Sequence, residues 1–250
     1  NGESWSTNKN WLSSNSECLW SGIECLPSSD TIRGIQMNSN LLVGNITSEL
    51  GSLTSLRTIN LSENGNLAGH IPTQILNLPT LRTINLEMTS VGGTIPSEIQ
   101  GLTNVEEIFF SKTAISGSIP TTFSQLQQLR VFRVKGAQLQ GGIDPLVGLS
   151  SLEDLDLAEN QLSQTIPTGL GELRYLYSLE LFNNKLTGTI PTQLVRMSEL
   201  IFADFGFNEL TGEVPTIICA LPSLDIFVVD CDKLNTTRCT CCSCSPGTGN

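Results

Sequence analysis

The sequence predicts an α/β-type repeat solenoid, a curved right-handed superhelix with nine parallel strands and a disulfide-bonded cap at each end. Three observations support this prediction. One apolar pattern recurs nine times, with successive copies 23 to 25 residues apart. All eight cysteines fall outside residues 26–218, close to the two ends of the chain. Hydrophobic residues make up 39% of the chain and charged residues 15%, as in a protein with a packed core.

Each repeat has the form LxxLxLxxNxLxGxIPxxLxxLxx, as in "LRTINLSENGNLAGHIPTQILNLPT" from Leu56. In "LRTINL", Ile59 and Leu61 point to one side, as alternate residues of a strand do. One such strand cannot bury its apolar side alone, so stacked copies form a parallel sheet over a continuous core. The Asn after the strand can hydrogen-bond backbone groups of the adjacent coil. The Pro lacks an N–H and suits an outer edge.

This pattern, and above all its "GxIP" segment, resembles the leucine-rich repeat in the subclass typical of plant extracellular proteins. The resemblance covers residues 32 to 232. It implies a leucine-rich-repeat superhelix whose nine parallel strands line a concave face. We expect residues 1–31 to form an N-terminal cap, 32–223 eight repeats, 224–244 the last strand with a Cys-rich cap, and 245–250 a flexible tail or linker stub.

The two ends of the chain resemble the caps of secreted members of this family. "WSTNKNWLSSNSECLWSGIEC" is similar to the N-terminal cap, which implies a Cys18–Cys25 pair. It also implies that Trp5, Trp11 and Trp20 form a lid over the first coil. The alternative is that one of these tryptophans stacks on a carbohydrate. After the strand "LDIFVVDC", the Cys-rich end resembles secreted leucine-rich-repeat proteins of microalgae such as diatoms.

The C-terminal cysteines permit two interpretations. They are Cys219, Cys231, Cys239, Cys241, Cys242 and Cys244. Four of them fall within "CTCCSC", a density that a metal–thiolate cluster also shows, but zinc sites usually draw on two separated pairs. The placement of cysteines at the two ends favours three disulfides in an oxidising compartment, and fifteen pairings of the six are possible.

Several repeats depart from the pattern. Three central repeats replace the turn Asn by Thr89, Thr113 and Ala137. The second repeat has one extra residue, so either Asn64 or Asn66 can occupy the turn position. Asp144 stands where Pro is usual, and Gln164 replaces the Gly. We therefore expect local irregularity in repeats three to six without a break in the solenoid.

Charge and motifs exclude several functions. The formal net charge of −11 argues against binding nucleic acid or an anionic membrane surface. No apolar run approaches the roughly 20 residues that span a bilayer. The single histidine, His70, lies in a turn, and no HExxH, GxSxG or P-loop motif occurs. We therefore expect neither an enzyme nor a bound cofactor. Three sequons suit an extracellular chain: Asn45, Asn60 (on the concave face) and Asn235.

The concave face is the candidate binding surface. Its central column reads Gln36, Asn60, Asn85, Phe109, Arg133, Asp156, Glu180, Asp204 and Val228, and its flanking column Arg33, Arg57, Arg82, Glu106, Arg130, Glu153, Tyr177, Ile201 and Asp225. The candidate ligand contacts are Arg130, Arg133, Lys135, Asp154, Asp156, Tyr177, Glu180, Phe182, Asp204 and Phe207. Aromatic and charged residues together are typical of a binding surface. The simpler alternative is a solvated sheet with cross-strand ion pairs. Two sharper alternatives for the carboxylates are a Ca²⁺ site and a retaining-glycosidase pair, although an open sheet does not enclose a sugar.

These features predict a secreted or cell-surface recognition module, non-catalytic, that binds a protein, peptide or polysaccharide ligand. We expect a monomer or weak homo-oligomer without membrane insertion. The chain resembles ectodomains of plant receptor-like proteins and polygalacturonase inhibitors. The alternatives are an adhesive cell-wall component, an inhibitor of a wall-degrading enzyme, and ice binding by ranks of threonine such as Thr94, Thr165 and Thr189, which His70, Gly142 and Glu213 interrupt.

Overall fold

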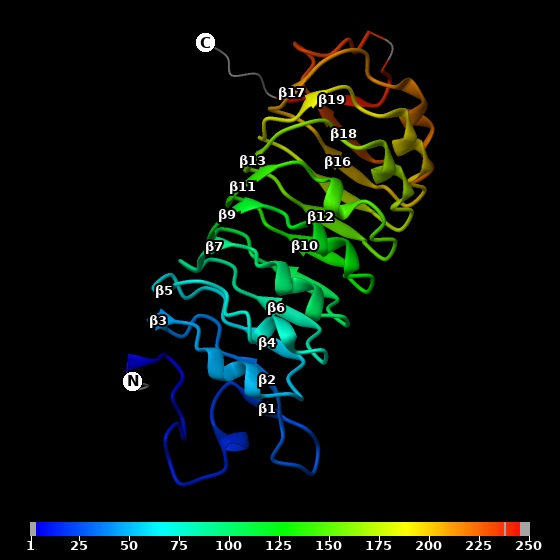
Figure 1. Ribbon diagram of the computed structural model, residues 1–250. Helices are drawn as coiled ribbons and strands as arrows, with labels where there is room; N and C mark the ends of the chain where they lie inside the picture. Colours follow the sequence, from blue (N-terminus) through cyan, green and yellow to red (C-terminus); the bar gives the residue numbers. More distant parts are fainter. Residues whose placement is uncertain (1–3, 238, 246–250) are drawn as a thin grey trace.

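A computed structural model describes residues 4–237 and 239–245, and its main feature is one long parallel sheet along a curved solenoid (Figure 1). The nine repeat strands are β2 (Ile32–Gln36), β4 (Thr58–Asn60), β6 (Thr83–Asn85), β8 (Glu107–Phe109), β10 (Val131–Arg133), β12 (Asp154–Asp156), β14 (Ser178–Glu180), β16 (Phe202–Asp204) and β18 (Ile226–Val229). They pair in this order, each parallel to the next. The nine predicted parallel strands are therefore confirmed.

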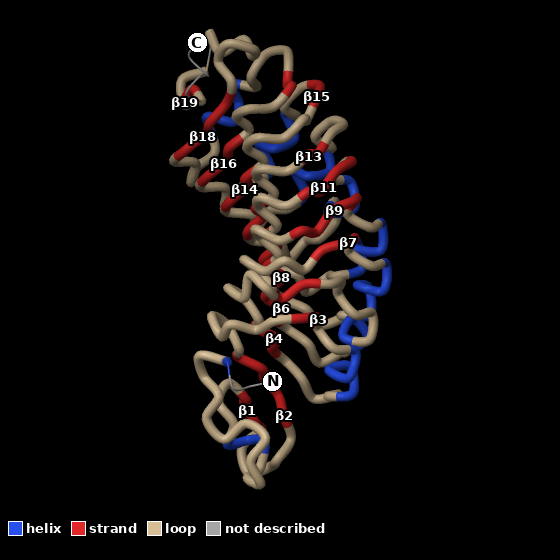
Figure 2. The backbone as a smooth tube through the Cα atoms, turned by 90° about the vertical axis from the view of Figure 1, so that its left-hand side faces the viewer, coloured by secondary structure: helices blue, strands red, loops and turns tan. Residues whose placement is uncertain are grey.

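Two further layers complete each coil. On the flank, short strands form three small sheets: β3 (Gly44–Asn45), β5 (Leu67–Ala68), β7 (Gly92–Thr94), β9 (Ala114–Ser118), β11 (Gln138–Gly141), β13 (Gln161–Leu162), β15 (Thr187–Gly188) and β17 (Glu209–Leu210). Figure 2 shows the 3₁₀ helices on the side away from the long sheet: η3 (Ser48–Ser52), η4 (Ile75–Asn77), η5 (Ser97–Gly101), η6 (Thr121–Gln125), η7 (Asp144–Leu146), η8 (Thr168–Glu172), η9 (Thr192–Arg196) and η10 (Thr216–Ala220).

The core runs unbroken through all nine coils. Each of the nine repeat strands contributes one inward residue in register, and all are buried: Ile35, Ile59, Ile84, Ile108, Phe132, Leu155, Leu179, Ala203 and Phe227. From the helical side, Phe123 packs on Phe132 with ring centroids 4.6 Å apart. Where Ala203 is small, Phe205 and Phe227 fill the space, with centroids 5.7 Å apart. Burying each large side chain contributes about 1.5–3 kcal/mol.

The turn asparagines connect neighbouring coils. Asn64, and not Asn66, occupies this position in the second repeat, where it is 1% exposed. Its side-chain amide donates to the carbonyls of Met37 and Leu61, both at 2.9 Å, and its oxygen accepts from the backbone N–H of Leu42. The same arrangement recurs at Asn160, Asn184 and Asn208. These side chains satisfy buried backbone groups that the turn leaves without strand partners.

The expected irregularity in repeats three to six was wrong for the flank, because β7, β9, β11 and β13 from these repeats form its widest sheet, of four strands. The departures stay local. Thr113 bonds only within its own coil, donating to the carbonyl of Phe110 at 2.7 Å. Asp144 begins η7, which has three residues where neighbouring helices have five. Gln164 takes the glycine position with φ of 72°.

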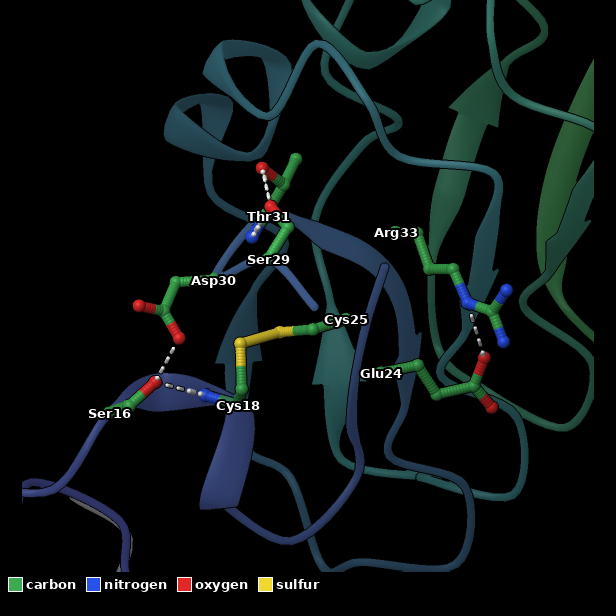
Figure 3. Close-up of a disulfide and its surroundings, with 8 residues drawn as sticks. All are labelled: Ser16, Cys18, Glu24, Cys25, Ser29, Asp30, Thr31 and Arg33. Carbon is green, nitrogen blue, oxygen red and sulfur yellow. Dashed lines mark hydrogen bonds and ion pairs between the residues drawn. A yellow bond between two sulfur atoms is a disulfide. The ribbon is translucent and has the colours of Figure 1, made fainter. Parts of the chain in front are cut away.

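The N-terminal cap covers the first coil with an antiparallel strand. Strand β1 (Ile23–Cys25) pairs with β2, and the short helix η2 (Glu17–Leu19) precedes it. Figure 3 shows the Cys18–Cys25 disulfide and, on the concave side, Arg33 reaching Glu24 with a separation of 4.0 Å. The three tryptophans form one cluster, with Trp5–Trp11 and Trp11–Trp20 centroids each 4.8 Å apart. Trp5 and Trp11 pack against the core, as a lid does.

The C-terminal cap adds a strand that the sequence analysis did not predict. Strand β19 (Cys242–Cys244), inside "CTCCSC", pairs parallel to β18 as a tenth parallel strand. Three disulfides hold this cap: Cys219–Cys241, Cys231–Cys244 and Cys239–Cys242. Ser245 is also part of the cap, because its N–H donates to the Val229 carbonyl and it is 9% exposed, which corrects its assignment to a flexible tail. The remaining residues of that predicted tail, 246–250, lie outside the described residues.

Candidate functional site

The strand register brings the predicted central column of the concave face together. Arg133, Asp156, Glu180 and Asp204 stand side by side on β10, β12, β14 and β16. Adjacent strands in a sheet lie about 4.8 Å apart, so these side chains form a single row. The row alternates with the buried strand residues because successive side chains point to opposite faces of the sheet.

Cross-strand ion pairs engage the cations at the centre of this face. Arg130 binds Glu153 in a two-pronged contact, with its Nε and one terminal nitrogen 2.8 and 2.9 Å from the two carboxylate oxygens. This contact raises the pKa of Arg130. Lys135 lies 3.5 Å from Glu159. These pairs agree with the simpler alternative of a paired, solvated sheet, and exposed pairs of this kind contribute at most about 1 kcal/mol.

Asp154 anchors two other candidate residues and does not face solvent. It is 2% exposed, and its carboxylate accepts hydrogen bonds from the Arg133 guanidinium and from the Tyr177 hydroxyl, the latter at 3.3 Å. Its hydrogen bond to Arg133 raises the pKa of that guanidinium, and burial followed by the Asp154 charge raises the pKa of Tyr177. We therefore remove Asp154 from the candidate ligand contacts and assign it the role of positioning Arg133 and Tyr177.

The carboxylates of Asp156, Glu180 and Asp204 differ from their charged neighbours. Among the described residues, no Lys, Arg or His nitrogen lies within 4.0 Å of any of them, whereas the central cations are paired. Burial is the main cause that raises the pKa of each, and the Asp156 charge adds to it at Glu180. Asp156 and Asp204 accept backbone N–H groups from Ala158 and Gly206. We call these three residues the carboxylate row.

An aromatic pair adjoins the carboxylate row. Phe182 follows β14 and Phe207 follows β16, and their rings meet edge to face with centroids 5.1 Å apart. Both side chains are half-buried, so part of each ring faces solvent. The backbone holds Phe207 in place, since its N–H donates to the Asp230 carboxylate at 2.7 Å. A cation bound at the row would therefore have an aromatic surface beside it.

Metal binding by these carboxylates finds no support in their arrangement. In the described part of the chain, the single group of three Cys, His, Asp or Glu ligand atoms within 4.8 Å of one another is Cys219, Cys239 and Cys241. All three sulfurs are already in disulfides, two of which lie side by side with Cys219 and Cys239 Sγ atoms 3.7 Å apart. Cysteine binds zinc as a thiolate, and a sulfur in a disulfide is not one.

Exposed apolar residues at the edge of this face were not predicted from the sequence. Tyr175 and Ile201 are exposed and lie near Tyr177, and the exposed Ile226 follows on the next strand, where its N–H donates to the Ile201 carbonyl at 3.1 Å. The signal was present in the flanking column, where Tyr177 and Ile201 are the two uncharged residues of nine. The sequons fall on two sides of the solenoid, Asn45 and Asn235 on the flank and Asn60 on the concave face. Asn45 in β3 is exposed, Asn60 stands in the central column of β4, and Asn235 forms an isolated bridge with Glu213.

The stacked coils, the long parallel sheet and the two disulfide-bonded caps define a leucine-rich-repeat solenoid of the plant type. A family model described as a leucine-rich repeat region matches residues 37–201, so the chain belongs to the leucine-rich-repeat family. No curated protein sequence matches the chain. Within the described residues, no helix has both the length and the apolar character needed to cross a membrane.

Solved structures with this fold include plant receptor ectodomains. The leucine-rich-repeat ectodomain of the receptor kinase GASSHO1/SCHENGEN3 from Arabidopsis thaliana, in complex with CASPARIAN STRIP INTEGRITY FACTOR 2, is 30% identical with a TM-score of 0.73, over 87% of this chain and 29% of that one. The plant peptide hormone receptor RGFR1 in complex with RGF2 is 26% identical with a TM-score of 0.64, over 81% and 35%. A plant ice-binding protein is 23% identical with a TM-score of 0.70, over 89% and 79%. The chain thus spans about a third of these receptor ectodomains.

Proposed function

We propose that this protein is a non-catalytic recognition module, secreted or at the cell surface. Its concave face binds a peptide or protein segment that carries lysine or arginine. The observation that supports this proposal is the carboxylate row of Asp156, Glu180 and Asp204. It lacks counter-charges within 4.0 Å among the described residues and adjoins the Phe182–Phe207 pair. Disulfides at both ends of the chain support an extracellular location.

The chemistry of the row favours a cationic ligand. Burial raises the pKa of each carboxyl, which means that the ionised form has lost part of its hydration, and no described cation within 4.0 Å compensates for this loss. An ammonium or guanidinium group supplies that partner, and hydrogen bonds to charged groups contribute about 1.5–3 kcal/mol each. The faces of Phe182 and Phe207 can accept the stem of the same side chain or contact its cation.

The two receptor structures support a ligand-binding role, since each shows a leucine-rich-repeat receptor in complex with a partner. Because this chain spans about a third of those receptors, we propose for it only that the repeat surface binds a ligand, and not that it acts as a receptor. Inhibition of a wall-degrading enzyme with a basic surface is a special case of the same proposal. An acidic polysaccharide is disfavoured at this row by like-charge repulsion.

The test is a matched pair of charge variants. The triple variant Asp156→Asn, Glu180→Gln, Asp204→Asn removes the row, and Glu17→Gln, Glu49→Gln, Glu98→Gln removes three exposed carboxylates of the N-terminal cap and the helical side. We expect the wild type and the control to capture the same basic partner from the secretome of the source cells, identified by mass spectrometry. We expect the row variant to bind that partner at least about tenfold more weakly. Equal binding by all three proteins would refute the proposal.

One observation favours ice binding as a second candidate. The four-stranded flank sheet contains no charged residue in β7, β9, β11 or β13, although the chain carries a net charge of −11. Thr94 in β7, and Thr165 beyond the end of β13, each place a methyl group close to a glycine of the next coil. A Cβ placed on Gly117 would lie 2.8 Å from the methyl carbon of Thr94, and Gly188 stands in the same relation to Thr165 at 2.9 Å. Thermal hysteresis that is lost in Thr165→Lys would support this candidate, and freezing behaviour equal to that of albumin would exclude it.

A further inference from the structure

A hollow at the edge of the concave face exposes apolar side chains outside the carboxylate row. It has a volume of about 510 Å³ and is lined by Glu153, Tyr175, Tyr177, Glu199, Ile201 and Ser223. Tyr175 is 65% exposed, Ile201 47% and Tyr177 38%. Ile226, 41% exposed, extends the same surface, because the preceding residue, Asp225, pairs with the Ile201 backbone at 2.9 Å.

The position of these residues in the repeat makes their exposure informative. In the flanking column, seven of nine repeats carry a charged residue: Arg33, Arg57, Arg82, Glu106, Arg130, Glu153 and Asp225. The two exceptions, Tyr177 and Ile201, are direct neighbours, since the Ile201 N–H donates to the Tyr177 carbonyl. The fold does not require apolar residues here, because charged ones serve elsewhere in the same column. Clustered exposed apolar residues mark interaction surfaces, and tyrosine is frequent among residues that dominate binding energy.

Unpaired carboxylates border the hollow. Glu199 and Asp225 have no Lys, Arg or His nitrogen within 4.0 Å among residues 4–237 and 239–245. The nearest cations along the chain are engaged, Arg196 by Glu172 and Lys233 by Asp230. The border is therefore acidic. This charge disfavours a second copy of the chain, which would bring the same acidic border and a net charge of −11.

We propose that this hollow is a docking site for a protein partner that inserts an aromatic or branched aliphatic side chain between Tyr175, Tyr177 and Ile201. Lysine or arginine residues beside that side chain pair with Glu199 and Asp225. The hollow works independently of the carboxylate row, although Tyr177 lines the hollow and donates its hydroxyl to Asp154, two residues before Asp156. The inserted apolar side chain thus supplies the contact with the hollow, and the acidic border favours partners that have basic residues beside it.

The experiment selects binders from a phage-displayed library of random twelve-residue peptides against the whole protein. We expect enriched peptides with an aromatic or branched aliphatic residue flanked by Lys or Arg. A synthetic copy of an enriched peptide should bind Ile201→Ser and Tyr175→Ser at least about tenfold more weakly than wild type. Ile201→Leu should retain binding. The matched control is Ile217→Ser in η10, where Ile217 is 53% exposed away from the hollow.

The outcomes separate this inference from the proposed function. The carboxylate-row triple variant should bind the selected peptide as wild type does, even if that variant loses the secretome partner. Absence of enrichment, enriched peptides without an apolar residue, or an affinity unchanged by Ile201→Ser would overturn the inference. So would a dimer in sedimentation velocity that Ile201→Ser dissociates, because a second copy would then cover the hollow. Thermal unfolding of each variant verifies that the fold is intact.

Discussion

Replacing Asn184 tests how the turn asparagines hold neighbouring coils together. Its amide donates to the carbonyls of Leu157 in the preceding coil at 2.9 Å and Leu181 in its own coil at 3.1 Å. Its oxygen accepts from the Leu162 N–H of the preceding coil at 3.0 Å. Each hydrogen bond contributes about 1 kcal/mol net, and a buried group left unpaired adds about 1 kcal/mol or more. Asn184→Ala should therefore lower the free energy of unfolding by about 3–4 kcal/mol.

Asn184→Thr separates bonds within a coil from bonds between coils. The chain itself shows what threonine does here, since Thr113 keeps the bond to the carbonyl of Phe110 three residues earlier. Asn184→Thr should keep the bond to Leu181 and lose those to Leu157 and Leu162, at a cost of about 2 kcal/mol. Thr113→Ala, the control, loses only bonds within its coil, the one to the Phe110 carbonyl and a long one from the Ile115 N–H at 3.4 Å, and should cost about 1 kcal/mol.

Urea unfolding followed by circular dichroism measures these differences, and amide hydrogen exchange locates them. The Leu162 amide should exchange faster in both Asn184 variants and at the wild-type rate in Thr113→Ala. Equal costs for Asn184→Ala and Thr113→Ala would refute the reasoning, because bonds between coils would then contribute nothing. Equal costs for the alanine and threonine variants at position 184 would refute the part assigned to the Leu181 bond.

Four further predictions concern the concave face and the caps. Glu180→Gln should stabilise the protein by up to about 1 kcal/mol near pH 7, because it removes a half-buried carboxylate directly opposite Asp156. Burial raises the pKa of Glu180 in the folded state, so the ionised carboxylate destabilises the folded protein and the protonated carboxyl does not. The gain should therefore shrink as pH falls through that raised pKa and vanish near pH 3, as thermal unfolding across pH would show. Replacing both Cys231 and Cys244 by serine opens a loop with a separation of 13 residues, and should cost about 3 kcal/mol in urea unfolding. Thiol titration of the unreduced protein should detect no free cysteine, while thiols released by a chelator would indicate a metal cluster instead. Finally, Asp154→Asn should weaken the Arg133 contact and restore the pKa of Tyr177 towards its usual value, measurable by ultraviolet titration of the phenol.

The repeat made much of the fold predictable. Because the period is close to 24 residues and the strand period is two, aligning Leu56 with Leu81 also aligned Asn60 with Asn85, and the strand register agrees. The central column of the concave face therefore followed from the sequence. What did not follow was the contact of each side chain within a column, since this depends on rotamers set by neighbouring strands. Asp154 illustrates this, because Arg133 and Tyr177 close over it from two different coils.

The caps were predictable in kind and not in detail. The cysteine positions indicated crosslinks, but the pairing depends on how residues 230–245 fold over the last coil, for which no repeat exists to copy. Strand β19 has little strand character of its own, with the sequence Cys-Ser-Cys. Its pairing with β18 depends on the disulfides at both of its ends, Cys239–Cys242 and Cys231–Cys244. Crosslinks, rather than intrinsic propensity, therefore explain this strand.

The pairing of β18 with β19 also affects whether another molecule can add strands to the end of the long sheet. A parallel sheet has two open edges, and an unprotected edge is a template on which another chain can add strands. At one end β1 runs antiparallel to β2, so a further coil in the parallel sense finds no matching partner. At the other end, disulfides lock β19 over the edge of β18. Reduction of these disulfides would free that edge, and molecules could then join end to end into filaments. The cysteines thus protect the last repeat strand from pairing with another chain, independently of their contribution to stability.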